Sequence, residues 1–298
     1  MARKLGGSTF AFVRQWVKRH AVSAFLGRAC VISWAAWLPL LAQTQGWIAF
    51  LTAAGLHLVG GLGPSVAAVI VIGCLDGRAG LVELGHRLMA WRGRRNAWVF
   101  VLVVPPALLL LTAPLAAVVA GGSLDDLSWA AFGQSTEFAG LPVVAYWLAN
   151  LIFFVLGEEV GWRGFLQPRL ELRRTAVASA GLVSIPWALW HLPLFGITPG
   201  DRAMPLLGFL GFALSIWVAS WIFAWLLHVG GGSLLIVVVF HAWFDIVTNS
   251  PLGPPLLPTA MGAAVTVVGL VVLHRLLQLP LTSATPDRVF AGIRRPSR

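Results

Sequence analysis

Hydrophobic runs follow one another along almost the whole chain, and most approach or exceed the roughly 20 residues that a membrane-spanning helix needs. Short polar or glycine- and proline-rich stretches separate them. The predicted spans are residues 26–43, 47–75, 97–120, 141–167, 175–194, 204–228, 233–249 and 259–278. The pattern predicts an all-α polytopic membrane protein with about eight transmembrane helices.

Glycine and proline mark where this pattern should break. The cluster at 60–64 lies inside the second run and predicts a break or kink, with Pro64 at the start of a new helix. The three glycines at 230–232 form a turn so short that the flanking spans must be antiparallel. Residues 76–96 are predicted to form a polar loop, and residues 121–139 an acidic one.

Composition agrees with a membrane protein, because 58% of the 298 residues are hydrophobic and only 11% are charged. The formal net charge is +10, but the basic residues flank apolar runs and form no recognition face. They indicate contact with membrane lipids, and no nucleic-acid partner is expected. Three regions are predicted: a basic leader at 1–23, one transmembrane domain at 24–278, and a basic tail at 279–298.

The basic segments also predict an orientation. With eight spans, nearly every Lys and Arg falls on the side that holds both termini, and the acidic 121–139 loop falls on the other. Cytoplasmic loops of membrane proteins carry such an excess of positive charge. Both termini should therefore be cytoplasmic, and the bacterial cytoplasmic membrane is the expected location.

Charged side chains at the end of the fourth span are the main candidates for chemistry. Glu158 and Glu159 are adjacent there, and Arg163 follows four residues after Glu159. A charge at bilayer depth costs roughly 2.5–3.5 kcal/mol on insertion scales. On a helix Glu159 and Arg163 can pair, which leaves Glu158 without a cation and available as a base. A structural ion-pair cluster at a helix end is the alternative.

Two later spans add imidazoles at comparable depth. His191 lies near the end of the fifth span, and His241 and Asp245 share one face of the seventh. These residues predict a polar pocket among spans four, five and seven. Further candidates to line it are Asn150, Trp162, Trp187 and Trp190.

The chemistry that fits this set is hydrolysis of an amide. A carboxylate and an imidazole can together remove a proton from water, and a second imidazole can stabilise charge on a carbonyl oxygen. No Ser or Cys is placed as a nucleophile, so direct attack by water is favoured. A metal-free site is favoured and no cofactor is assigned, but Glu158, His191 and His241 could also bind a divalent metal such as zinc. The HExxH spacing of many zinc peptidases is absent.

Taken together, the three motifs resemble the type II CAAX prenyl endopeptidases, also called the CPBP or Abi family, and look like a bacterial member. The family pattern is two glutamates with an arginine four on, an aromatic four before a histidine, and a histidine four before Asn or Asp. The matching residues here are Glu158, Glu159, Arg163, Trp187, His191, His241 and Asp245.

The resemblance implies roles for these residues. Glu158 and His191 would activate the water, Glu159 and Arg163 would brace the site, and His241 with Asp245 would form the oxyanion side. Trp187 stands where phenylalanine is commoner, and Asp245 where eukaryotic enzymes have asparagine. Because an ionised aspartate cannot donate a hydrogen bond, Asp245 must be protonated or must orient His241.

The expected function is therefore that of an intramembrane endopeptidase acting on a peptide or a lipid-modified protein. The rival is a non-catalytic membrane protein that gives immunity to a bacteriocin and keeps the same fold. A proton-coupled transporter is less favoured, because no inverted repeat with paired broken helices is visible.

Overall fold

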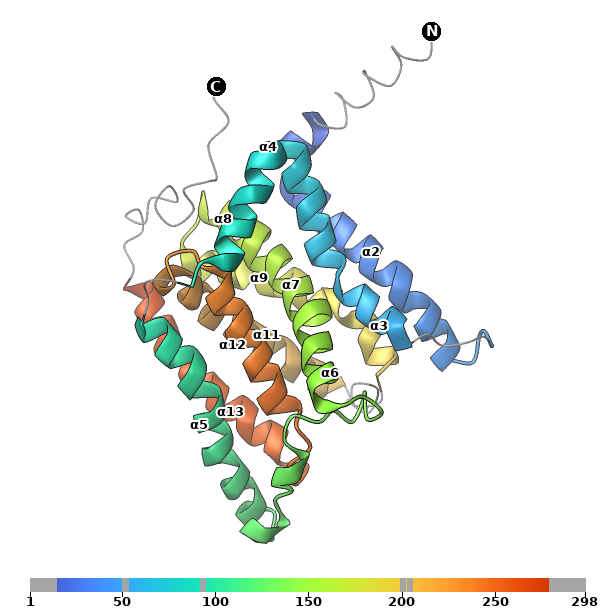
Figure 1. The fold of residues 1–298 in the computed structure, drawn as a ribbon, viewed down its shortest axis with the longest axis vertical. Helices are drawn as coiled ribbons and strands as arrows, with labels where there is room; N and C mark the ends of the chain where they lie inside the picture. Colours follow the sequence, from blue (N-terminus) through green and yellow to red (C-terminus); the bar gives the residue numbers. More distant parts are fainter. Residues whose placement is uncertain (1–14, 50–53, 92–94, 199–201, 203–205, 279–298) are drawn as a thin grey trace.

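The computed structural model describes residues 15–49, 54–91, 95–198, 202 and 206–278, and in this part every regular element is helical. Most of the predicted leader and the whole predicted tail lie outside the described residues. The α-helices from α2 onward that the structure describes pack into one bundle (Figure 1). They are α2 (Ala21–Thr44), α3 (Ala54–Gly61), α4 (Gly63–Met89), α5 (Arg95–Val119), α6 (Val143–Ala149), α7 (Leu156–Gly161), α8 (Gln167–Glu171), α9 (Ala176–Trp190), α11 (Leu206–Val229), α12 (Leu234–Asn249) and α13 (Leu257–Leu277).

Seven helical segments of the described chain are long and apolar enough to cross a membrane. The eighth predicted span corresponds to α12, an apolar helix of 16 residues, which is shorter than the roughly 20 that a full crossing needs. The prediction of an all-α polytopic membrane protein is confirmed.

Capping side chains set the start of two helices that carry the candidate histidines. The Thr175 hydroxyl accepts from the Ala178 amide, and the Ser233 hydroxyl accepts from the Ile236 amide. Each satisfies one of the amides that a helix N-terminus leaves without a partner. These caps fix where α9 and α12 begin, and hence which residues reach the pocket.

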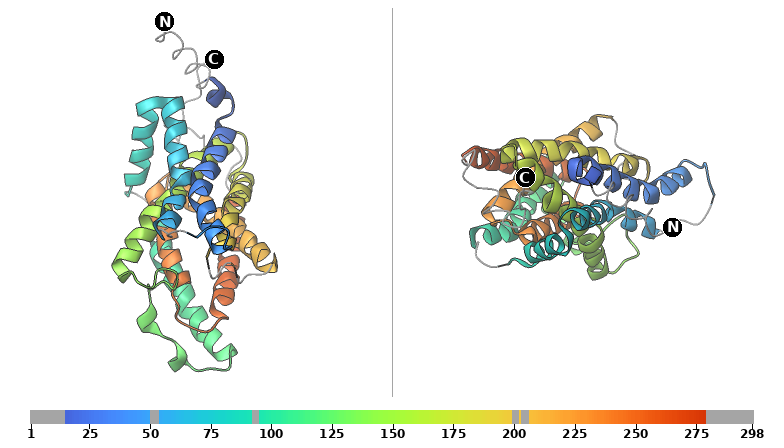
Figure 2. Two further views of the ribbon diagram at one scale, coloured as in Figure 1. Left: turned by 90° about the vertical axis from the view of Figure 1, so that its right-hand side faces the viewer. Right: turned by 90° about the horizontal axis from the view of Figure 1, so that it is seen from above.

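The prediction of a polar loop at 76–96 is wrong for most of that stretch. Helix α4 continues to Met89 but reverses at Gly77, whose φ of 62° and ψ of −148° are accessible almost only to glycine. The chain therefore forms two arms that lie side by side at one end of the molecule (Figure 2). The returning arm buries Leu84 and Arg87 against the bundle, so the polar residues there do not form a free loop.

Glycines allow the break between α3 and α4 to pack closely against α7. The chain interrupts its helix at Leu62 and restarts with Pro64 in the first turn, as predicted. A Cβ added to Gly161 would lie 2.5 Å from the Pro64 Cβ and 2.8 Å from its carbonyl carbon. A Cβ on Gly157 would collide with the Gly61 carbonyl. Small residues are the usual means of such close approach between membrane helices.

The segment that carries the two glutamates is helical throughout but irregular. Two π-helical stretches, η3 (Asn150–Val155) and η4 (Trp162–Leu166), flank the short α7. A π turn leaves backbone carbonyls without their usual partner and changes the direction of the following side chains. Such π-helical turns are rare, and they often lie at functional sites.

Candidate active site

Glu159 and Arg163 form a fully buried ion pair at the centre of the bundle. Arg163 Nη1 donates to Glu159 Oε1 at 2.9 Å, and both residues have an exposed fraction of 0%. The guanidinium also lies over the rings of Trp187 and Phe223, at 4.1 and 4.3 Å from their centroids. Charge, hydrogen bonding and cation–π contact therefore hold this arginine in one place.

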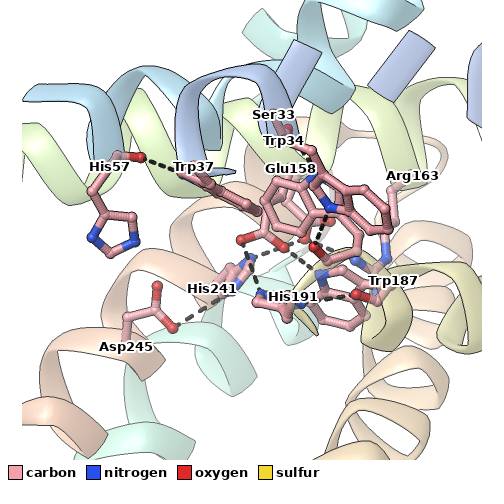
Figure 3. A network of polar contacts seen from close by, with 12 residues as sticks. Ser33, Trp34, Trp37, His57, Glu158, Arg163, Trp187, His191, His241 and Asp245 are labelled. Atoms are coloured by element: carbon pink, nitrogen blue, oxygen red, sulfur yellow. Dashed lines mark hydrogen bonds and ion pairs between the residues drawn. The ribbon is translucent and has the colours of Figure 1, made fainter. Parts of the chain in front are cut away.

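Glu158 points to the other side of α7, toward α9 (Figure 3). The indole Nε1 of Trp187 donates to its Oε2 atom. Its Oε1 atom lies 4.0 Å from Nε2 of His191, too far for a direct hydrogen bond. Glu158 is 6% exposed and pairs with no arginine or lysine among the described residues.

The hydrogen bonds of His191 define which ring nitrogen carries a proton. Its Nδ1 atom lies 2.8 Å from the Trp187 carbonyl oxygen, which can only accept, so Nδ1 is the donor. In the neutral ring Nε2 then has a free lone pair, and this atom faces Glu158. The two groups thus present two acceptors to the space between them.

His241 lies between two carboxylates. Its Nδ1 atom lies 2.9 Å from Glu159 Oε1, and its Nε2 atom lies 3.5 Å from Asp245 Oδ1. Asn150 is buried beside Asp245. Asp245 therefore lies where it can orient His241, which is one of the two roles considered from the sequence.

The structure brings Glu158, Glu159, Arg163, His191, His241 and Asp245 into one cluster. Of the three tryptophans, only Trp187 contacts a candidate carboxylate. Trp162 and Trp190 are buried in aromatic packing, with Trp162 edge-on to Phe25 and Trp190 donating to the Ser33 hydroxyl. Proximity alone assigns no roles, so the catalytic and substrate-lining assignments stay predictions.

Two contacts near the cluster are not predicted by the sequence analysis. Arg87 donates to the carbonyl oxygens of Arg163, Gly164 and Gly232, at 3.2, 3.0 and 3.0 Å. The sequence places this arginine in a predicted polar loop, because five arginines lie close together there. His57 has no acidic residue close to it in the sequence, yet it pairs with Glu137, 80 residues away.

The candidate donors do not form a metal site. In the part of the chain that the structure describes, no three His, Cys, Asp or Glu side chains are arranged to hold one ion. Glu158 and His191 are near each other, but the remaining imidazole is directed at Glu159 and Asp245. The described residues therefore do not fit a three-ligand zinc site in this geometry.

Fold and cluster together define a polytopic helical membrane protein with a buried glutamate–histidine site. Residues 140–247 match the family model described as Rce1-like, type II CAAX prenyl endopeptidase. This segment is therefore similar to that family, and the resemblance inferred from the motifs is confirmed.

A curated relative gives the same result. CAAX prenyl protease 2 of Methanococcus maripaludis is 30% identical over 146 residues, which cover 47% of this chain and 51% of the relative. The chain thus spans about half the length of the curated relative it matches. Neither comparison favours the bacteriocin-immunity alternative.

Proposed function

We propose that this protein is an intramembrane endopeptidase of the CAAX prenyl protease type. It hydrolyses a peptide bond near the C-terminus of a lipid-modified or membrane-embedded substrate. The observation that carries the proposal is the pair of acceptors, Glu158 Oε1 and His191 Nε2, held 4.0 Å apart inside an apolar bundle. The match to the CAAX endopeptidase family supports it.

Water activation follows from that pair. Two hydrogen bonds of about 2.8 Å from one water molecule span roughly 4–4.5 Å, close to the separation of the two acceptors. A water bound to both directs both protons toward the protein and an oxygen lone pair away from it. Glu158 takes one proton as the water oxygen attacks the carbonyl carbon of the peptide bond.

The remaining groups stabilise the negative charge that develops during the attack. The attack places negative charge on the carbonyl oxygen, and His241 Nε2–H donates to it when the ring holds both protons. Glu159 and Asp245 orient that ring from its two nitrogens. The carbon–nitrogen bond breaks as Glu158 returns its proton to the leaving amine, which restores the starting carboxylate.

The substrate class and the orientation are part of the proposal. The glutamates and His191 lie within helical segments of membrane-spanning length, so a substrate must reach them from the bilayer or through one of its surfaces. A prenylated C-terminal segment partitions into the bilayer and meets this requirement. The distribution of Lys and Arg supports cytoplasmic termini in a bacterial membrane, and the basic leader and tail are regions of lipid contact.

The test is cleavage of a farnesylated C-terminal peptide by the purified protein in lipid nanodiscs. We expect Glu158→Gln and His191→Ala to lose cleavage by at least about 100-fold while they keep the wild-type unfolding temperature. Asp125→Asn, an exposed carboxylate in the 121–139 loop, is the matched control and should cleave as wild type does. Equal cleavage by a folded Glu158→Gln protein would reject the assignment.

A further inference from the structure

Trp187 contacts both members of the proposed water-activating pair. Its indole Nε1 donates to Glu158 Oε2, and its backbone carbonyl accepts from His191 Nδ1 at 2.8 Å. Figure 3 shows these side chains facing one another. We infer that Trp187 is the positioning residue that sets the geometry of both groups at once. The inference rests on the proposed function for its kinetic consequence, but the contact itself is testable without activity.

The side-chain contact decides which carboxylate oxygen is free. An indole N–H can only donate, so it holds Oε2 of Glu158 and leaves Oε1 toward His191. Without this donor the carboxylate can rotate about its last torsion, which is broad for glutamate. The 4.0 Å separation between Oε1 and Nε2 would then no longer be fixed.

The backbone contact exists because α9 ends just beyond Trp187. The last four carbonyls of a helix have no intrahelical amide partner. Helix α9 ends at Trp190, and the His191 amide donates to the Ala188 carbonyl, so the Trp187 carbonyl is left for the imidazole. Pro193 lies two residues farther on and prevents the helix from continuing. The helix end thus fixes the tautomer that leaves Nε2 as an acceptor.

The ring of Trp187 is itself held in place. It is 2% exposed, and the Arg163 guanidinium lies 4.1 Å from its centroid. Arg163 is paired with Glu159, so the indole contacts Glu158 directly and is linked to Glu159 only through this arginine. A phenylalanine would keep much of the packing and the cation–π contact but would supply no donor to Glu158.

The chain offers a matched control for removing one indole N–H. Trp221 is also buried, at 8% exposed, and its Nε1 atom has no hydrogen-bond partner among the described residues. Trp187→Phe and Trp221→Phe therefore remove the same atoms from two buried sites, but only the first loses a contact to Glu158. The comparison separates loss of the hydrogen bond from loss of ring volume.

The kinetic experiment measures cleavage of the farnesylated peptide by both variants. We expect Trp187→Phe to lower kcat by about 10- to 100-fold, with KM changed less than about twofold, because misplacement of reacting groups acts on the chemical step. Trp221→Phe should stay within about twofold of wild type in both. Equal kcat values for the two variants would overturn the inference while leaving the proposed function intact. If Trp187→Phe does not fold, benzothienylalanine introduced at position 187 keeps the ring shape and removes only the N–H.

A second measurement does not depend on cleavage. In 15N-labelled protein, the indole cross-peak of Trp187 can be assigned among the 15 tryptophans by its loss in Trp187→Phe. Glu158→Ala should shift that peak upfield in the proton dimension, and should leave the Trp221 peak in place. A Trp187 peak that does not move would overturn the inference whether or not the protein cleaves peptides. If no prenylated peptide is cleaved but the peak moves, the proposed function fails and the contact between Trp187 and Glu158 is supported.

Discussion

Replacing Gly161 with alanine tests whether close helix packing positions the candidate site. Gly161 is the last residue of α7, two and three residues beyond the two glutamates, and it faces the start of α4. A Cβ at this position would lie 2.5 Å from the Pro64 Cβ and 2.8 Å from the Pro64 carbonyl oxygen. Comfortable contacts between such atoms are about 3.5 Å or more, so the two segments must separate by about 1 Å.

The cost follows from which atoms are involved. Two of the three nearest atoms are backbone, and the third belongs to a proline ring, so none can move aside by a change of rotamer. Overpacking of this kind costs typically about 1–3 kcal/mol. The midpoint of thermal unfolding should fall by about 2–10 °C. A displacement of about 1 Å at the glutamates should lower cleavage by about 100-fold.

Gly27→Ala is the control, because Gly27 also lies inside a long helix but a Cβ there would meet no atom within 4 Å. Both variants would be compared by thermal unfolding in nanodiscs and by cleavage of the farnesylated peptide. Gly27→Ala should match wild type or be slightly more stable, since alanine is the better helix former. If Gly161→Ala behaved like Gly27→Ala in both assays, the argument from close packing would be wrong.

Three further predictions concern neighbouring groups. Arg87→Met should lower the free energy of unfolding by about 2–4 kcal/mol, measured by denaturant titration, because three buried carbonyl groups lose a charged donor. Arg163→Met should cost about 3–5 kcal/mol because it leaves the Glu159 charge buried and unpaired, and adding Glu159→Gln should recover part of that loss in the same titration. Cleavage should be unchanged after exhaustive chelation, and activity that disappears and returns with added zinc would contradict the metal-free mechanism.

Much of the fold could be predicted, because the length of a hydrophobic run and the positions of charged residues beside it can be read directly from the local sequence. In the described part of the chain, each of the eight apolar runs contains a helix, and the break near Pro64 lies where glycine and proline indicated it. The failure at 76–96 has a physical reason. A polar, arginine-rich stretch is typical of a loop, but Gly77 reverses the chain and returns it along the bundle. There the buried backbone carbonyls of η4 and of the glycine turn offer Arg87 the acceptors it needs.

The candidate site was predictable as a set of residues but not as a geometry. Sequence spacing correctly paired Glu159 with Arg163 and placed His241 and Asp245 on one face, since both pairs are four residues apart on a helix. No such spacing rule predicts which residues of different helices will be in contact. His241 reaches Glu159 across 82 positions, and His57 reaches Glu137 across 80.

The exact end of a helix is the least predictable feature here, and the proposed chemistry depends on it. If α9 continued by one regular turn, the amide of His191 would occupy the Trp187 carbonyl. The imidazole would then lose the acceptor that holds its Nδ1 proton, and either tautomer would be available. Because the helix ends at Trp190, the ring takes that carbonyl and keeps Nε2 as an acceptor toward Glu158. The activity proposed here therefore depends on where one helix stops as much as on which residues it carries.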